Sequence, residues 1–218
     1  MNPTQIFVDR YDAGRRLAQL LLRYAGRRDV IVLALPRGGV PVAYEIAQHL
    51  HLPLDVFTVR KIGLPFHEEF AMGAIGSGGA CVFNYDVIDA LHVSHTSVAQ
   101  AVVRERRELD RRERAYRDDR PFPQLADKTL IVVDDGIATG ASMHVAITAL
   151  RERNPARIIV AAPVGSEDGC TLVRRYADEL VCAVIPHAFG SVAQYYSHFE
   201  QLDDESVRSL LGTRALAS

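Results

Sequence analysis

The stretch LIVVDDGIATGAS, Leu130 to Ser142, decides both the fold and the position of the site. It begins with a run of apolar, mostly branched residues that is too short for a helix and is typical of a strand buried on both faces. Two adjacent acids, Asp134 and Asp135, follow this strand, and a loop of small residues leads into the next helix. In open α/β sheets, the carboxyl ends of the strands form the ligand crevice. The stretch therefore predicts a parallel sheet with an acid-bearing site at one edge.

The pattern of apolar strand, glycine-containing loop and helix occurs more than once along the chain. Val30–Leu35 has the composition of a buried strand, Pro36-Arg37-Gly38-Gly39 interrupts it, and Val40–Leu50 follows with helical spacing. The other strands are expected at Leu54–Arg60, Thr129–Val133, Arg157–Val164 and Leu180–Pro186, and the other helices at 9–25, Met143–Arg153 and Asp168–Tyr176. This alternation predicts an α/β fold with a doubly wound, mainly parallel sheet flanked by helices.

A segment in the middle of the chain departs from this alternation. Residues 64–120 are expected to form an insertion, in which Met72–Phe83 reads as a β-hairpin around a glycine-rich turn. Residues 96–117 form a long and mostly charged helix. It is interpreted either as a solvated helix on the rim of the sheet or as an arm that reaches a phosphate-bearing ligand or a second subunit. With residues 186–218 as a C-terminal hood and helix, 1–218 is expected to be a single domain.

Composition and charge narrow the class of protein. The 218 residues are 48% hydrophobic and 24% charged, and 25 basic against 27 acidic side chains give a net charge of −2. This balance gives no expectation of a nucleic-acid partner. No apolar run approaches the roughly 20 residues of a membrane span. Three cysteines without a CxxC pair, and no signal-peptide pattern, lead us to expect a cytoplasmic protein.

The loop after the acid pair has the features of an anion site. Backbone N–H groups at the start of the next helix, together with the hydroxyls of Thr139 and Ser142, would bind a phosphate. Two carboxylates beside a phosphate would repel it unless a sugar diol or a divalent cation lies between them. The combination indicates a sugar phosphate as the ligand. The plainer alternative is a helix-capping acid next to a surface acid.

The sequence VVDDGIATGAS resembles the phosphoribosyl-pyrophosphate-binding motif of the type I phosphoribosyltransferases. The resemblance covers residues 9–200 and is closest to an uncharacterised bacterial branch with a DRxDAG start and a late YYxxF. It implies a Mg²⁺-dependent enzyme of nucleotide metabolism that transfers ribose 5-phosphate from phosphoribosyl pyrophosphate to a nucleobase or another small nitrogenous acceptor and releases pyrophosphate. It also implies a homodimer, with residues 189–199 as part of the hood over the acceptor.

The resemblance assigns roles to individual residues. Asp134 and Asp135 would hold the ribose hydroxyls and, with Arg37 and Lys61 on the departing diphosphate, form the catalytic set. Mg²⁺ would be held mainly through the substrate, with a direct bond from Asp134 or Asp135 as the alternative. For Pro36-Arg37-Gly38-Gly39 the alternative is a plain strand–helix turn. For Arg60 and Lys61 the alternative is a charged strand end that meets solvent. The expected substrate-binding residues are Gly38, Gly39, Arg60, Gly136, Ala138, Thr139, Gly140, Ala141 and Ser142.

One departure from the family leaves the acceptor open. In the 6-oxopurine enzymes an aspartate stands directly before the Thr-Gly pair, where this chain has Ala138, so the purine interpretation loses its general base. Glu68 or Glu69 is a candidate replacement, in a segment, residues 64–80, that is expected to close over the ligand. A non-catalytic protein that senses phosphoribosyl pyrophosphate is the alternative function. A phospho-acceptor receiver domain is disfavoured, because its acid pair would lie at the first strand.

Overall fold

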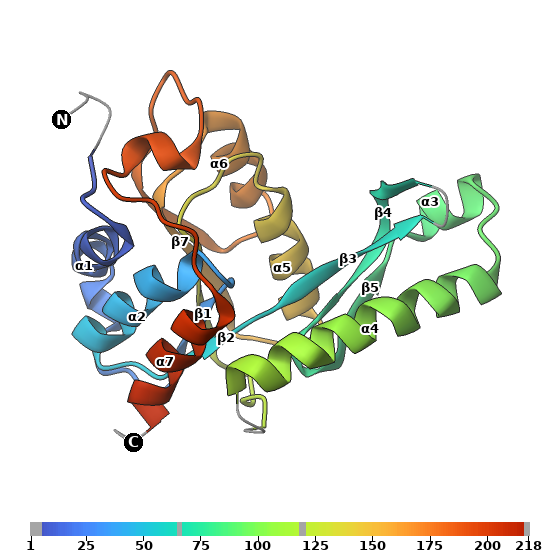
Figure 1. The fold of residues 1–218 in the computed structure, drawn as a ribbon, viewed down its shortest axis with the longest axis horizontal. Coiled ribbons are helices and arrows are strands. Elements are labelled where there is room, and N and C mark those ends of the chain that lie inside the picture. Colours follow the sequence, from blue (N-terminus) through green and yellow to red (C-terminus); the bar gives the residue numbers. More distant parts are fainter. Residues whose placement is uncertain (1–5, 65–66, 118–120, 216–218) are drawn as a thin grey trace.

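The computed structural model describes residues 6–64, 67–117 and 121–215, and these form two sheets (Figure 1). The larger sheet has five parallel strands in the order β2-β1-β6-β7-β8. The smaller sheet has three antiparallel strands in the order β3-β4-β5. The strands are β1 Val30–Ala34, β2 Leu54–Val56, β3 Val59–Leu64, β4 His67–Gly76, β5 Ala80–Phe83, β6 Thr129–Val133, β7 Arg157–Val164 and β8 Glu179–Val184.

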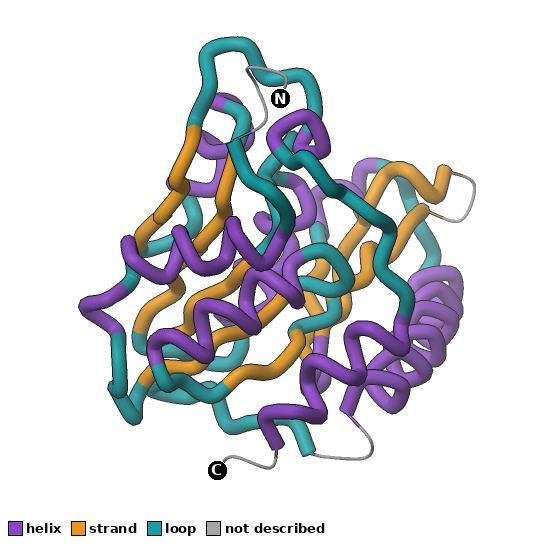
Figure 2. Tube along the Cα trace, turned by 60° about the vertical axis from the view of Figure 1, so that its left-hand side comes forward, coloured by secondary structure: helices purple, strands orange, loops and turns teal. Residues whose placement is uncertain are grey.

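Helices cover both faces of the parallel sheet. On one face α1 and α2 lie together with α7, and on the other face lie α5 and α6. The layer of α1 and α2 comes forward in Figure 2. The helices are α1 Arg10–Leu20, α2 Gly39–Leu50, α3 Tyr85–Ala90, α4 His95–Arg117, α5 Ala141–Arg151, α6 Glu167–Arg174 and α7 Asp204–Ala215. The predicted doubly wound α/β fold is confirmed.

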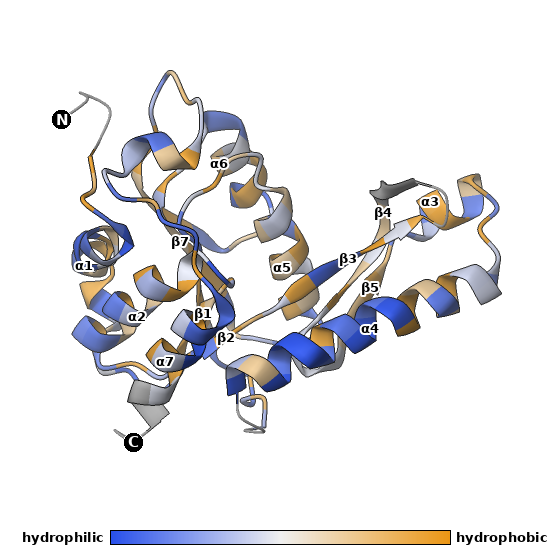
Figure 3. Cartoon of the chain, viewed as in Figure 1, coloured by the Kyte–Doolittle hydropathy of each residue, from blue (hydrophilic) through white to orange (hydrophobic). Residues whose placement is uncertain are grey.

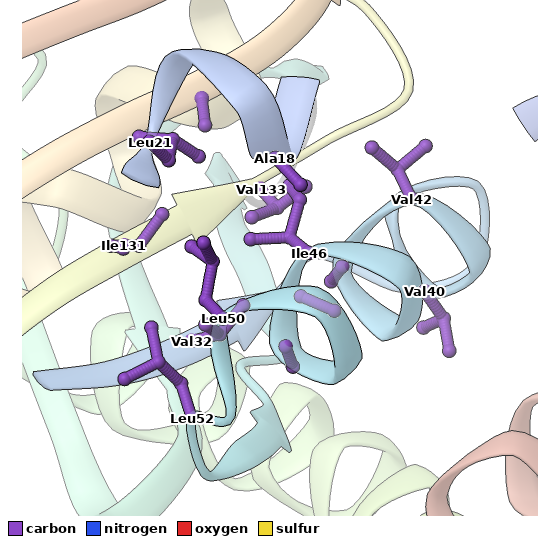
Figure 4. Close-up of a cluster of buried hydrophobic side chains, with 14 of the residues drawn as sticks. Ala18, Leu21, Val32, Val40, Val42, Ile46, Leu50, Leu52, Ile131 and Val133 are labelled. Atoms are coloured by element: carbon purple, nitrogen blue, oxygen red, sulfur yellow. The ribbon is translucent and has the colours of Figure 1, made fainter. Parts of the chain in front are cut away.

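The parallel strands are apolar throughout because each face of the sheet meets a helical layer. Successive side chains of a strand point to opposite faces, so in β1 Val32 joins the cluster under α2 while Leu33 joins the cluster under α5. Figure 4 shows Leu50 of α2 beside Val32, and Ile46 of α2 near Ala18 and Val133. Full burial of one such side chain contributes roughly 1.5–3 kcal/mol. This core holds the carboxyl ends of β1 and β6 at a fixed separation.

The smaller sheet, α3 and α4 make up residues 59–117, which we call the side unit, and it extends away from the parallel sheet (Figure 1). One face of this sheet packs on α4 through a separate cluster that includes Ile62, Met72 and Leu109. Its other face meets α5, where a Cβ on Gly76 would come within 3.4 Å of Ala149. The predicted hairpin is confirmed, and its first strand begins earlier than expected, at His67.

Helix α4 is charged along most of its length and carries a thin apolar stripe (Figure 3). Two i,i+4 ion pairs lie along it, Glu108 with Arg112 and Glu113 with Arg117. Arg117 is 4% exposed, and its guanidinium also contacts Asp55 at 2.8 Å and donates to the carbonyl of Val56 at 2.5 Å. The C-terminal end of the helix is therefore attached to β2 of the parallel sheet.

The prediction of one strand over Leu54–Arg60 is wrong. The segment divides into β2, which pairs with β1, and β3, which pairs with β4 in the other sheet. The chain leaves the parallel sheet after Phe57, whose N–H donates to Ala34, and at Thr58 the backbone pairs with Ser77 instead. The residues on both sides of this point, Val56 to Val59, all favour strands, so the composition carries no sign that the strand changes sheets.

Other boundaries differ by smaller amounts. The helix expected over 9–25 ends at Leu20 and continues only as a 3₁₀ turn, Leu22–Tyr24. The helices expected at Val40–Leu50, Met143–Arg153 and Asp168–Tyr176 begin one or two residues earlier than predicted. Such shifts are common because helix ends depend on capping. Within the described ranges, no helix has a stretch that is both long and apolar enough to cross a membrane.

The hood segment packs as a small aromatic cluster beside β7 and β8. Tyr195 and Tyr196 are each 3% exposed, and they pack with Phe7 and Val164. Both tyrosine rings are therefore used in packing. The backbone of Phe7 also forms an isolated parallel β-bridge with Tyr196, so the N-terminal segment and the hood lie side by side.

Candidate functional site

The site lies where the strand order of the parallel sheet reverses direction. From β1 the chain crosses to β2 on one side, while β6, β7 and β8 follow in order on the other side. The loops after β1 and β6 therefore leave the sheet next to each other, and the N–H of Leu35 donates to the carbonyl of Val133 at 2.8 Å. Such a switch point is where open α/β sheets bind ligands. The two sequence motifs are thus brought together.

Glycine is required where the two loops meet. A Cβ on Gly39 would lie 2.5 Å from the carbonyl oxygen of Val133, and a Cβ on Gly38 would overlap the carboxylate of Asp135. The sequence interpretation counted these glycines among the substrate-binding residues. The structure adds a reason for glycine at these positions, because the acid pair itself occupies the space beside them.

Asp135 is held by residues from both ends of the described chain. Arg10 donates from Nε and contacts from Nη2 the same Oδ2 atom, each at 2.8 Å, and the Tyr196 hydroxyl donates to the Asp135 carbonyl at 2.6 Å. The guanidinium of Arg10 lies 3.8 Å from the centre of the Phe199 ring. Arg10 had no predicted role. The DRxDAG and YYxxF patterns that contain Arg10, Tyr196 and Phe199 therefore converge on one residue, Asp135: Arg10 contacts its carboxylate, Tyr196 its backbone carbonyl, and Phe199 the guanidinium of Arg10.

Asp134 is placed differently from its neighbour. Its Oδ1 accepts the N–H of Asp135 at 2.9 Å, and the residue lines a cavity. Burial, and then the negative charge of Asp135, raise the pKa of Asp134 well above its ordinary value. Burial likewise raises the pKa of the Tyr196 hydroxyl, with the charge of Asp135 adding to it. The site therefore stabilises a ligand that donates hydrogen bonds or positive charge to Asp134.

The loop from Gly136 to Ser142 has the expected form of an anion cradle. Ile137 is buried and exchanges backbone hydrogen bonds with Val164 and Ser166, which fixes the middle of the loop. Gly140 adopts φ +76°, a left-handed conformation that favours glycine, and it caps the N-terminus of α5. The N–H groups of a first helical turn have no carbonyl partner within the helix. The N–H of Ala141 already donates to Thr139 Oγ1 at 3.3 Å, and the others of this turn are available to an anion.

A cavity of about 180 Å³ connects these elements. It is lined by Pro36 of the first loop, Asp134 of the acid pair, Ser142 at the start of α5 and Lys61 of β3. It is also lined by two residues that the sequence analysis did not single out, Thr58 and Arg112. Their positions depend on the packing of the side unit, and no local motif marked either of them.

The remaining predicted basic residues lie outside this lining. Arg60 points to α4, where its Nε and Nη2 both contact Glu105 Oε2 at 2.7 Å. Arg37 is exposed, and its charge acts on Tyr116 and Asp203. The side chains of Glu68 and Glu69 lie outside what the structure describes, as do residues 65 and 66 of the expected lid. Their suggested roles stay predictions.

The donors suit a cation that arrives with a ligand. Within residues 6–64, 67–117 and 121–215, no group of three or more His, Cys, Asp or Glu side chains is placed to hold a metal ion. Asp134 and Asp135 supply two carboxylates, of which Asp135 already contacts Arg10. Mg²⁺ commonly uses one or two protein carboxylates and completes its shell with substrate phosphate oxygens and water. This donor set fits that use.

A doubly wound sheet with an acid pair and a glycine-bounded helix N-terminus at its switch point is typical of the class of α/β proteins that bind phosphorylated ligands. Comparisons with known proteins agree. The chain is 42% identical over 207 residues to two curated proteins from Mycobacterium tuberculosis, strains CDC 1551 and H37Rv, both provisionally named phosphoribosyl transferase. The match covers 95% of this chain and 46% of each relative, so the chain spans about half the length of those relatives.

A solved structure is similar over nearly the whole chain. The crystal structure of the protein TT1426 from Thermus thermophilus has a TM-score of 0.84 and 38% sequence identity, covering 95% of this chain and 98% of that one. The family model described as a phosphoribosyl transferase domain matches residues 5–69 and 74–199. The chain belongs to the phosphoribosyl transferase domain family, a family of enzymes whose reaction class is the transfer of a phosphoribosyl group.

Proposed function

We propose that this protein transfers ribose 5-phosphate from phosphoribosyl pyrophosphate to a small nitrogenous acceptor and releases pyrophosphate. The observation that carries the proposal is the cavity at the switch point, which Asp134, Lys61 and Ser142 line together. Each supplies chemistry suited to a different part of the donor: an acceptor for ribose hydroxyls, a cation for the diphosphate, and a hydroxyl at a helix start for the 5-phosphate.

The proposed roles follow from what each group can do. As the bond to the diphosphate breaks, negative charge grows on the leaving group, and a positioned cation such as Lys61 stabilises it by about 3 kcal/mol. Positive character grows on the ribose ring, and Asp134 would stabilise it. Among the described residues, Asp134 has no cationic partner comparable to Arg10, which contacts Asp135. Mg²⁺ bound to the diphosphate would supply further charge neutralisation, with Asp134 as its protein carboxylate. Arg10 keeps Asp135 oriented, so the pair need not rearrange when the ligand enters.

The acceptor is proposed only as a class. Ala138 stands where the 6-oxopurine enzymes have an acid, and it is exposed. Its carbonyl accepts a hydrogen bond from Ser166 at 2.5 Å, so the backbone at this position is held in the loop. We propose an acceptor nitrogen that needs no proton removed by a side chain at position 138. A homodimer remains part of the proposal by resemblance.

The first experiment measures pyrophosphate release from Mg²⁺ and phosphoribosyl pyrophosphate in the presence of pooled purines, pooled pyrimidines or other small amines. We expect release that depends on one pool, which identifies the acceptor class. Tight binding of phosphoribosyl pyrophosphate without release in any pool would favour the alternative, a non-catalytic sensor. Absence of binding by calorimetry would overturn the proposed function.

The acid pair provides the matched variant. We expect Asp134→Asn combined with Asp135→Asn to weaken binding of Mg²⁺–phosphoribosyl pyrophosphate by at least roughly a hundredfold, since hydrogen bonds to charged groups are worth about 1.5–3 kcal/mol each. The single variant Asp134→Asn is the control for folding, and its melting temperature is compared with that of wild type. A raised pKa means that ionising this carboxyl costs stability as the pH rises, so the single variant should melt no lower than wild type at neutral pH. Unchanged affinity in the double variant would contradict the ribose assignment.

A further inference from the structure

One wall of the cavity comes from the side unit and from the junction between the two sheets. Arg112 of α4 and Thr58, between β2 and β3, line it together with Lys61. Neither Arg112 nor Thr58 belongs to the motifs that carry the family resemblance. Arg112 lies on the charged helix, for which the sequence left two interpretations open, a solvated rim or a contact with a phosphate-bearing ligand.

Thr58 carries a hydrogen-bonding group that the described protein does not satisfy. Its residue is 2% exposed, and its hydroxyl oxygen has no hydrogen-bond partner among the residues the structure describes. Its backbone is fully engaged with Ser77, which accepts the Thr58 N–H at 2.9 Å and donates its own N–H to the Thr58 carbonyl at 3.0 Å. Buried hydroxyls are almost always paired, and an unpaired one destabilises the fold. A ligand oxygen in the cavity would supply the missing partner.

Helix α4 is fixed on both sides of Arg112. Before it, Glu105 is 8% exposed and pairs with Arg60 of β3, and after it Arg117 is attached to β2. Arg112 and Arg37 both act on the buried Tyr116 as positive charges that oppose the rise in its pKa, which burial raises to about 12. The two arginines therefore approach the same region from α4 and from the loop after β1.

The guanidinium of Arg112 can turn to a ligand without leaving an acid unpaired. Its Nε donates to Glu108 Oε1 at 2.9 Å. Arg111 independently donates to both oxygens of Glu108, at 2.8 and 3.0 Å. Exposed ion pairs of this kind contribute little to stability. An anion in the cavity would then receive the forked donors of Arg112 while Glu108 keeps its second partner.

We propose that Arg112 and Thr58 form, together with Lys61, a binding subsite for the diphosphate group of the sugar donor. This proposal rests on the proposed function and adds to it the charged helix as a component of the site. The guanidinium would donate to the diphosphate oxygens, and the Thr58 hydroxyl would donate one further hydrogen bond.

The test compares two adjacent arginines that share the same acid. Wild type, Arg112→Met and Arg111→Met are titrated with inorganic pyrophosphate in the presence of Mg²⁺ by calorimetry. We expect Arg112→Met to weaken binding roughly tenfold to a hundredfold, as for the loss of a charge-assisted hydrogen bond. Arg111→Met removes the same charge from the same helix outside the cavity and should change the affinity less than about twofold. An equal loss in both variants, or none in either, would overturn the proposal.

Thr58→Val separates binding from folding. Valine keeps the shape of threonine and removes the unpaired hydroxyl, so the variant should unfold at the same temperature as wild type or higher, while its affinity for pyrophosphate falls several-fold. A hydroxyl with a purely structural role would show the reverse, lower stability with unchanged affinity, and that result would overturn its place in the subsite.

A third ligand distinguishes this proposal from the proposed function. Arg112→Met should bind ribose 5-phosphate, which lacks the diphosphate, as wild type does. One outcome separates the two proposals: wild type binds phosphoribosyl pyrophosphate, the Asp134/Asp135 double variant does not, and Arg112→Met binds pyrophosphate as wild type does. In that case the proposed subsite is wrong and the proposed function stands. If wild type binds neither pyrophosphate nor phosphoribosyl pyrophosphate, both are overturned.

Discussion

The two walls of the cavity are built in opposite ways. The wall at the edge of the parallel sheet consists of backbone and short side chains packed so closely that Gly38 and Gly39 admit no Cβ. The wall from the side unit consists of long charged side chains, among them Lys61 and Arg112, whose ends are partly exposed. A packed wall can hold a group of fixed shape, whereas a wall of flexible cations can follow a group that leaves. This difference agrees with the proposed roles, in which the sheet edge would hold the ribose phosphate and the side unit would hold the diphosphate.

The largest effect is expected from filling the packed wall. In Gly39→Ala the new methyl group would lie 2.5 Å from the Val133 carbonyl, a backbone atom that cannot move without shifting β6. Overpacking of this kind costs roughly 3 kcal/mol, so we expect a large drop in melting temperature and loss of phosphoribosyl pyrophosphate binding. Chemical denaturation and calorimetry measure both.

The matched control for this change is Gly212→Ala. Gly212 lies in α7, and a Cβ there would meet nothing within 4 Å. Alanine is favoured over glycine in helices by up to about 1 kcal/mol, so this variant should be as stable as wild type or more stable. If Gly39→Ala also folds and binds normally, the sheet-edge wall is more adaptable than its packing implies.

Removing the guanidinium of Arg10, which contacts the Asp135 carboxylate, is expected to have an intermediate effect. Arg10→Met leaves a half-buried carboxylate without its cation and should lower the free energy of unfolding by about 2 kcal/mol, with weaker binding of the sugar donor. Arg15→Met on the same helix removes a single 3.2 Å contact between an exposed arginine and Glu45, and should cost less than about 1 kcal/mol. The free energy of unfolding is measured by denaturant titration. Equal losses in the two variants would mean that Arg10 contributes no more to stability than an arginine at the surface.

The smallest effect is expected where the smaller sheet joins α4, at the pair of Arg60 and Glu105. Burial alone would raise the pKa of Glu105, but hydrogen bonds from Arg104 and Arg60 lower it overall. A lowered folded-state pKa gives stability that is present above the ordinary pKa of the carboxyl and is lost as the pH falls through the lowered one. Glu105→Gln should therefore cost about 1 kcal/mol at neutral pH and progressively less in acid.

Exposed Glu152 at the C-terminal end of α5 provides the comparison for that pH series, as Glu152→Gln. The difference in unfolding free energy between Glu105→Gln and wild type should shrink as the pH falls, while the Glu152 variant follows wild type throughout. A difference that grows toward low pH would show that the Glu105 carboxyl is destabilising when ionised.

Local patterns predicted the parallel sheet because a strand buried on both faces needs an uninterrupted apolar run, as in Thr129–Val133. They failed at Thr58, because the change of sheet there depends on a pairing with Ser77, nineteen positions later. A run of apolar residues specifies that a segment is buried and extended. It does not specify which neighbour receives its hydrogen bonds.

The same limit applies to the site. The acid pair and the loop before α5 could be predicted because their chemistry depends on residues adjacent in sequence. Arg10 could not be assigned, since it acts on a carboxylate 125 positions away, although the motif around it was visible. Arg112 lay in a helix whose charge pattern has an ordinary explanation in ion pairs such as the one with Glu108. Only the packing of α4 against β3 brings it to the cavity.

The contacts that Arg10 and Tyr196 make with Asp135 have a consequence for how the protein folds. These three residues come from α1, the loop after β6 and the hood, separated by 125 and 61 positions. Contacts between residues so distant in sequence close large loops and form late in folding. A chain in which only the central strands have assembled would hold an acid pair whose second carboxylate lacks its arginine. The ligand then recognises only the completed fold, and its binding stabilises the whole molecule against unfolding.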